Sequence, residues 1–232
     1  MPRRTMKGRR RFRRRRRRMR IPRRRLPPVG MPSKQLVRLR YCDEITLDPV
    51  AGAIATYNFS ANGMFDPDIT AVLGHQPLYF DQYMSNYDHY TVIGSRIRVT
   101  CVPHDAAYAT TAYPGAFGIN LSDDPTWNYT SFPQIVESNQ NRGYYRSYSN
   151  SLTGANTSGK APTIVRKFSA KKFFQAALTD SNKGTVATNP TDQAYYQVWA
   201  SSVDSNDPSR ANFLVEIEYI ALLTEPKFIA RS

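Results

Sequence analysis

The residues with the clearest chemistry are the cations at the start of the chain. Of the first 40 residues, 19 are Lys or Arg and none is Asp or Glu. An arginine guanidinium pairs with phosphate through two hydrogen bonds and also stacks on nucleobases. Because each neutralised phosphate releases counterions, this composition predicts tight, salt-dependent binding to nucleic acid with little sequence preference. The predicted nucleic-acid-binding residues are Arg3, Arg4, Lys7, Arg9, Arg10, Arg11, Arg13, Arg14, Arg15, Arg16, Arg17, Arg18, Arg20, Arg23, Arg24, Arg25, Lys34, Arg38 and Arg40.

Catalytic and metal-binding chemistry has much weaker support in the sequence. The candidate acid–base or metal-ligating residues match no HExxH or CxxC spacing and include no third ligand at a recognisable distance; they are His75, Asp81, Asp88, His89, His104 and Asp105. A turn, a short helix and packed polar side chains account for the same residues. The sequence also contains no nucleophile elbow and no phosphate-binding glycine loop. We therefore expect a protein that is not an enzyme, with no metal and no cofactor.

Three further groups of residues each have a functional and a structural interpretation. Acidic pairs in loops could bind Ca²⁺ between subunits or form turns: Asp66, Asp68, Asp123 and Asp124. A basic cluster could hold nucleic acid or an anionic glycan, but a solvated strand face with edge-protecting lysines is favoured: Arg166, Lys167, Lys171 and Lys172. Aromatic residues in polar loops suggest an oligomer interface: Trp127, Tyr129, Phe132, Tyr144, Tyr145 and Tyr148.

The charge distribution divides the chain into two parts. Residues 41–232 contain 13 Lys or Arg and 18 Asp or Glu, which is a balance of 13 − 18 = −5. We predict a basic arm at 1–34 that does not fold alone and a folded domain at 35–232. Such asymmetry indicates a polyanionic partner, nucleic acid first and an anionic membrane surface second. The arginine run also matches a nuclear import signal, so host import receptors are predicted partners.

The sequence shows no secretory or membrane-spanning pattern. No apolar run approaches 18 residues, and the basic N-terminus lacks the apolar core of a secretory signal. Sequons occur at Asn58, Asn120, Asn128 and Asn156, and without a secretory route we interpret them as chance matches. The two cysteines are too few for a disulfide framework, which fits an intracellular origin.

Short runs with β-strand character follow the arm. Seven are clear: Leu36–Leu47, Ala53–Ser60, Tyr90–Val102, Ala116–Ser122, Thr163–Phe174, Tyr195–Ser202 and Phe213–Leu223. An eighth is expected between Phe174 and Asn189, and a short helix at Tyr79–Tyr87. The long connections and the lack of alternating helices and strands predict an all-β fold, an eight-stranded antiparallel jelly-roll sandwich.

Charge and parity along the strands make two finer predictions. In a jelly roll the last strand lies between the first and the third. Glu216 and Glu218 would then face Arg38 and Arg40 on one side and Arg96 and Arg98 on the other. The four arginines have two open uses, pairing with these glutamates and extending the nucleic-acid surface. Parity also places Cys42 on the polar face and Cys101 in the core, with Ile93, Ile97 and Val99 beside it, so we expect no disulfide.

The segment Gly74–Thr100, GHQPLYFDQYMSNYDHYTVIGSRIRVT, resembles part of the capsid proteins of circoviruses and related small circular single-stranded DNA viruses. The matching residues are Gly74, His75, Gln76, Pro77, Phe80, Asp81, Gln82, Tyr87, His89, Tyr90, Val92, Gly94 and Ser95, and FSAKKFF at Phe168–Phe174 is a second similar segment. The resemblance implies a jelly-roll coat protein that forms a T=1 icosahedral shell, most simply of sixty copies. It further implies a single-stranded DNA genome against the inner arm, entry into the host nucleus, and outer loops that attach to an unidentified cell-surface receptor.

Two other classes of function stay open at this point. A cellular nucleic-acid-binding structural protein with a basic extension would share the same charge division. An enzyme acting on nucleic acid would need a clustered acidic or histidine site, which the sequence lacks. A capsid subunit, found in the virion and in the host nucleus during assembly, is the function that we predict.

Overall fold

Alternating apolar and polar residues form the longest strands of the protein. A computed structural model describes residues 30–71, 74–102, 113–138, 143–148, 161–175, 178–204, 206–208 and 210–227. In β1 (Lys34–Leu47), Val37, Leu39 and Tyr41 are buried and the residues between them are exposed. The last strand, β9 (Ala211–Pro226), alternates in the same way. This period of two places one face of each strand against the core, as predicted.

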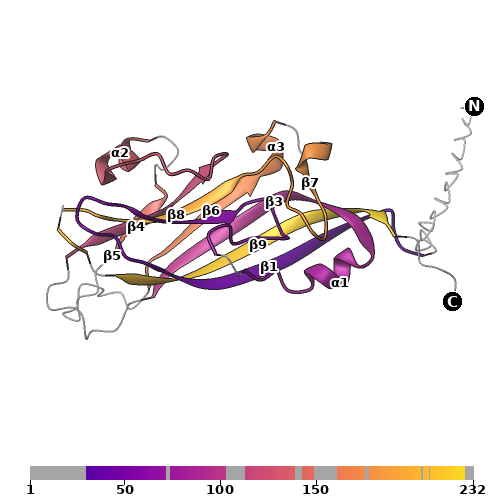
Figure 1. Ribbon diagram of the computed structural model, residues 1–232, viewed down its shortest axis with the longest axis horizontal. Helices are drawn as coiled ribbons and strands as arrows, with labels where there is room; N and C mark the ends of the chain where they lie inside the picture. The colour runs from indigo at the N-terminus through magenta and orange to yellow at the C-terminus, as the bar shows by residue number, and fades with distance from the viewer. Residues whose placement is uncertain are drawn as a thin grey trace, which may run out of the picture. The chain divides into compact units, whose positions relative to one another are not determined.

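The strands form two sheets that pack face to face (Figure 1). One sheet has the order β1-β9-β3-β6, with β7 also paired to β3; these added strands are β3 (Tyr87–Val102), β6 (Thr163–Ser169) and β7 (Lys183–Gly184). The other has the order β2-β8-β4-β5, formed by β2 (Ala55–Ser60), β8 (Tyr195–Ser202), β4 (Gly115–Ser122) and β5 (Tyr145–Tyr148). All the described strand pairs are antiparallel.

This strand order identifies the fold. Taken along the chain, the first, last, third and sixth strands form one sheet, and the second, eighth, fourth and fifth form the other. That arrangement is a double-sheet jelly roll in which β6 and β7 occupy one strand position beside β3. The predicted all-β jelly roll is confirmed, including the position of the last strand and a short extra strand between Phe174 and Asn189.

Hydrogen-bonded tyrosines hold the core together. Tyr219 Oη donates to the carbonyl oxygen of Ser60 at 2.7 Å, and Tyr196 Oη lies 2.9 Å from Ser95 Oγ. Tyr90 Oη accepts the backbone N–H of Met64 at 3.0 Å. Because buried hydroxyls need partners, these bonds attach the loop after β2 to the opposite sheet. Burial raises the pKa of Tyr90 to about 12, so its hydroxyl stays neutral.

Three local predictions from the sequence are wrong. Ile93 does not share the buried face of Ile97, because a bulge between Val92 and Gly94 changes the parity of β3 and leaves Ile93 half-buried. The run at Thr163–Phe174 is a strand only to Ser169 and continues as the short helix α3 (Ala170–Phe173). Residues Tyr145–Tyr148, interpreted as a loop, pair with β4 as strand β5. The predicted helix near Tyr79 is present as α1 (Phe80–Met84).

Most of the aromatic residues predicted for an interface also pack within the chain. Trp199 on β8 is fully buried under Trp127, Phe132 and neighbouring rings, with Trp127 and Trp199 centroids 6.4 Å apart. Phe132 begins the short helix α2 (Phe132–Glu137), which lies over this sheet in Figure 1. Tyr148 belongs to the main core. Tyr144 is 37% exposed, and the assignment of these aromatic loops to an oligomer interface stays a prediction.

A row of amides holds the same loop on the sheet. Asn58, Gln197 and Asn120 lie side by side on β2, β8 and β4. Gln197 Nε2 lies 3.1 Å from each of three loop carbonyl oxygens, those of residues 124–126, and Asn58 Nδ2 donates to the carbonyl of Pro125. Asn120 is buried and donates to Gln197. Two of the sequon asparagines therefore have structural roles, whereas Asn156 lies outside the described residues.

The cysteines face the directions that parity predicts. Cys42 is exposed, Cys101 is buried, and both are free. Burial raises the pKa of the Cys101 thiol to about 12. The described helices, including the single 3-10 turn η2 (Asp180–Asn182), are too short to cross a bilayer.

Candidate nucleic-acid interface

The predicted nucleic-acid-binding residues fall into two groups. Those from Arg3 to Arg25 lie outside the described residues. Lys34, Arg38 and Arg40 lie on β1, all on its exposed face, because they share the parity that points away from the core. The structure therefore places three of the predicted cations on the outer face of the β1-β9-β3-β6 sheet.

Strand register brings these arginines to the acidic residues of β9. Arg40 is the direct neighbour of Glu218 on one side, and Arg96 is its neighbour on the other. Glu218 Oε2 lies 3.4 Å from Arg40 Nε, 3.7 Å from Arg38 Nε and 3.9 Å from Arg96 Nη2. Glu216 Oε2 accepts a hydrogen bond from Arg98 Nη1 at 3.3 Å. The predicted charge pairing across three strands is confirmed.

These four arginines and two glutamates form an arginine ladder across three strands, and Glu218 is less exposed than its arginine partners. The Glu218 side chain is 17% exposed, whereas those of Arg38 and Arg40 are 61% and 71% exposed. Pairs with such exposed partners add little stability, about 0–1 kcal/mol each. The ladder is therefore better suited to holding charged groups in place than to stabilising the fold.

Cations outnumber anions on this face. Lys167 on β6 is exposed and lies directly beside Arg96, which extends the row across a fourth strand. A groove of about 140 Å³ runs between the strands and is lined by five members of the ladder together with Tyr41, Cys42 and Ile217; the five are Arg40, Arg96, Arg98, Glu216 and Glu218. Burial, followed by Glu216, raises the pKa of the Cys42 thiol. Three arginines and two glutamates line the groove, and its one thiol is not activated as a nucleophile, because its pKa is raised.

The GHQP segment protects the free edge of β1. Leu78 N donates to the carbonyl oxygen of Arg40 at 3.3 Å, and His75 Nε2 lies 3.1 Å from that of Cys42. The His75 ring stacks on Tyr41 with centroids 4.5 Å apart. Covering the edge in this way prevents pairing with other strands. His75 therefore has a structural use beside the arginine ladder.

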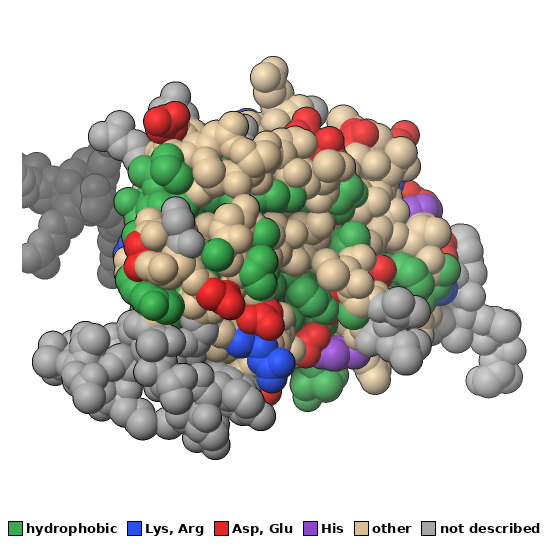
Figure 2. Space-filling view, turned by 60° about the vertical axis from the view of Figure 1, so that its left-hand side comes forward, with side chains coloured by type: hydrophobic (Ala, Val, Ile, Leu, Met, Phe, Trp, Pro, Cys, Tyr) green, Lys and Arg blue, Asp and Glu red, His purple; other side chains and the backbone are tan. Residues whose placement is uncertain are grey.

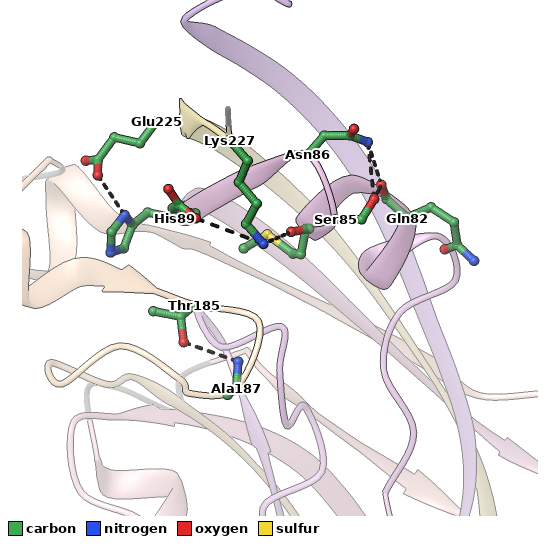
Figure 3. Close-up of polar contacts among 10 residues, drawn as sticks. Gln82, Ser85, Asn86, His89, Thr185, Ala187, Glu225 and Lys227 are labelled. Carbon is green, nitrogen blue, oxygen red and sulfur yellow. Dashed lines mark hydrogen bonds and ion pairs between the residues drawn. The ribbon is translucent and has the colours of Figure 1, made fainter. Parts of the chain in front are cut away.

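The other residues considered for acid–base or metal chemistry form separate contacts. His89 Nδ1 lies 3.0 Å from Glu225 Oε2, and Lys227 Nζ donates to the carbonyl of Met84 at 2.8 Å and lies 4.0 Å from Asp88 (Figure 3). These contacts attach the end of β9 to α1 and β3. Within the part of the chain that the structure describes, no three His, Cys, Asp or Glu side chains form a metal-binding group. His104 and Asp105 lie outside that part.

Two of the four acidic loop residues, Asp68 and Asp124, serve as turn formers. Asp68 is fully buried, accepts the Tyr57 hydroxyl at 2.8 Å and accepts the backbone N–H groups of Thr70 and Ala71 at 3.0 Å each. Asp124 accepts the N–H of residue 126 at 2.8 Å. Carboxylates engaged by their own turns match the structural interpretation rather than a calcium site.

The basic cluster near β6 is divided by the sheet. Lys167, Lys171 and Lys172 are exposed, but Arg166 is 7% exposed and points inward. Its guanidinium donates to the carbonyl oxygen of Ile119 and lies 4.4 Å from the centroid of the Tyr144 ring. The interpretation of Arg166 as part of a solvated face is wrong, because alternation on β6 turns it toward the other sheet. An inward-pointing charge on an edge strand is a known protection against edge pairing.

Comparisons with known proteins return similarities to solved structures. No protein-family model matches the chain, and no curated protein matches its sequence. The capsid protein of beak and feather disease virus, a circovirus, in its 60-mer form is 9% identical with a TM-score of 0.43, covering 86% of this chain and 97% of that one. Its decameric form is 7% identical with a TM-score of 0.41, covering 83% and 99%. Desmodium yellow mottle tymovirus is 14% identical with a TM-score of 0.42, covering 89% and 96%. The strand order of the two sheets by itself identifies the jelly roll.

The folded domain shows mixed charge where the arm is almost purely basic. Figure 2 shows a face with scattered Asp and Glu side chains and a compact group of Lys and Arg side chains beside some of them. Local grouping of cations, rather than the overall charge of the domain, is therefore what a polyanion would meet on its surface.

Proposed function

We propose that this protein is the capsid subunit of a small single-stranded DNA virus of the circovirus type, and that it packages its genome through the basic N-terminal arm. The observation that carries the proposal is a jelly roll in a chain whose first 40 residues contain 19 cations and no acids, with 16 of these cations before β1. The jelly roll would be the folded building block of the capsid shell. The arm supplies charge without sequence preference, which suits packaging of a whole genome.

The amount of charge agrees with this use. Sixty copies with 19 cations each would bring about 1,100 positive charges, which neutralise about that many phosphates. That scale suits a small single-stranded genome. The same arginine run would bind host import receptors before assembly and take the subunit into the host nucleus.

Electron microscopy of the purified full-length chain tests the proposal. We expect uniform small shells that contain nucleic acid. A variant lacking residues 1–31 should form shells that contain far less nucleic acid, and a variant with the arm arginines changed to lysine should keep packaging because the charge is unchanged. A full-length chain that stays monomeric with DNA at every salt concentration and pH would contradict the proposal and favour a cellular nucleic-acid-binding protein.

A further inference from the structure

The arginine ladder continues across the whole sheet as a row of charges. Arg40, Glu218 and Arg96 are direct neighbours on β1, β9 and β3. Lys167 follows Arg96 on β6. Direct cross-strand neighbours have Cβ atoms about 5 Å apart, so the row places like charges close together on the side of β3 and β6. Neighbouring cations without an anion between them are costly unless another anion covers them.

Neighbouring positions enlarge the same basic surface. Arg38 contacts Glu218 from the adjacent exposed position of β1, and Arg98 pairs with Glu216. We define the sheet face as five cations and two anions: Arg38, Arg40, Arg96, Arg98, Lys167, Glu216 and Glu218. Its balance is 5 − 2 = +3, although the unit Pro32–Ser232 has 16 Lys or Arg and 18 Asp or Glu, a balance of −2.

The charges of the sheet face are layered. Glu218 is mostly covered, whereas its three arginine partners are 43–71% exposed. Arg38 and Arg40 form their ion pairs with Glu218 through Nε, so these contacts do not use their terminal nitrogens. Each guanidinium has five N–H donors. The single carboxylate of Glu218 cannot accept hydrogen bonds from all the donors of three arginines. The exposed layer is therefore a set of oriented donors above a shared carboxylate.

We propose that the sheet face is a second binding surface for single-stranded nucleic acid, which contacts phosphate groups and requires no particular sequence. This inference rests on the proposed packaging function and names a surface beyond the arm. In it Glu218 is a positioning residue, which holds Arg38, Arg40 and Arg96 with their free donors outward. Pre-oriented arginines lose less conformational entropy when they bind a phosphate.

The unit Pro32–Ser232 allows this surface to be measured without the arm. All residues of its main hydrophobic core lie between Val37 and Leu223, so the unit contains what it needs to fold. Because its net charge is −2, attraction by total charge predicts no binding to a polyanion. We expect it to bind labelled oligothymidine at low salt, with an affinity that falls as NaCl rises. A unit that is folded by circular dichroism but does not bind would overturn the proposal.

Paired variants identify the surface. We expect Arg40→Gln combined with Arg96→Gln to reduce the slope of log K against log salt by about 1.4, since each contact to a single strand contributes about 0.7. Arg146→Gln is the matched control, because Arg146 is exposed on β5 of the other sheet and its change removes the same charge per residue. Equal weakening by the control, or no change in the double variant, would refute the assignment to this face.

A neutral substitution of Glu218 tests the positioning role. Glu218→Gln raises the net charge by one, so general electrostatics predicts tighter binding to oligothymidine. We expect binding several-fold weaker instead, because the three arginines lose their common anchor, with an unchanged unfolding midpoint. Glu218→Asp, which keeps the carboxylate, should recover part of the affinity. Tighter binding by Glu218→Gln would refute the positioning role.

Two further measurements separate this inference from other outcomes. A heparin oligosaccharide that binds the unit when oligothymidine does not would assign the face to a sulfated glycan and overturn the proposal. Shell formation by the full-length double variant is scored separately by microscopy. Intact shells with weakened binding by the unit support the inference, whereas shells that form while the unit binds nothing refute it and leave the capsid function standing.

Discussion

Replacing Gly118 with alanine tests how tightly Trp199 is held. A Cβ atom at Gly118 would lie 2.5 Å from Cζ2 of Trp199 and 2.6 Å from the carbonyl oxygen of Tyr144, where ordinary contacts begin at 3.4 Å. Trp199 is fully buried beneath Trp127 and Phe132, and Tyr144 O accepts the N–H of residue 119. In an interior packed at crystal density, neither neighbour can move by the missing ~0.9 Å without displacing others.

Overpacking of this kind costs about 1–3 kcal/mol, and we expect about 2–3 kcal/mol because a ring and a backbone carbonyl both obstruct the new methyl group. For a domain of this size, 1 kcal/mol changes the melting temperature by about 2–4 °C, so Gly118→Ala should melt about 4–12 °C lower. Thermal unfolding followed by circular dichroism, supported by urea titration, measures the change.

Gly74 provides a matched control for the same substitution. A Cβ atom there would lie 3.4 Å from Asp66 Oδ1, which is an ordinary contact, and the backbone at Gly74 is not left-handed. Gly74→Ala should therefore be neutral or raise stability by up to about 1 kcal/mol. The packing argument fails if Gly118→Ala melts with the wild type, or if Gly74→Ala loses as much stability.

Two more predictions concern side chains near the sheet face. In the native protein a thiol reagent should modify Cys42 and spare Cys101 until the chain unfolds. Glu216→Gln should speed modification of Cys42 at pH 8, because losing a nearby negative charge lowers the pKa of the Cys42 thiol. Equal rates of Cys42 modification in the variant and the wild type would count against an influence of Glu216 on this thiol. Arg166→Ala should cost about 1.5–3 kcal/mol by urea unfolding, because it removes a buried charged hydrogen bond, whereas Lys167→Ala should change stability by less than about 0.5 kcal/mol; similar losses would show that Arg166 is not buried.

Parity and charge were sufficient to predict the centre of the candidate interface. Alternation in β1 and β9 placed Arg40 and Glu218 on the exposed side, and the usual strand order of a jelly roll placed them on neighbouring strands. Both steps use regular geometry, which a local pattern reports well. The same reasoning found Cys101 in the core.

Prediction from the sequence failed at a β-bulge and where a side chain packs against residues that are distant in the sequence. The bulge at Ile93 inserts one residue into β3 and exchanges its faces, which no count along the sequence reports. Arg166 was assigned to the surface because charge usually lies there, but the position of Tyr144 across the sandwich makes burial possible. The packing of Trp127 and Phe132 within the chain was not predicted, because nothing near them in sequence shows that Trp199 lies beneath them.

The sequence by itself determined the division of charge between the N-terminal segment and the rest of the chain, and the strand periodicity; it predicts a polyanionic partner. Only the tertiary structure decided which cations act together. Arg38, Arg96 and Glu218 are widely separated along the chain, and the pairing of β9 with both β1 and β3 brings them within 4 Å of one carboxylate oxygen. The charge of each residue can be read from the sequence. Which charges lie side by side depends on the strand register, which exists only once β9 has paired with β1 and β3.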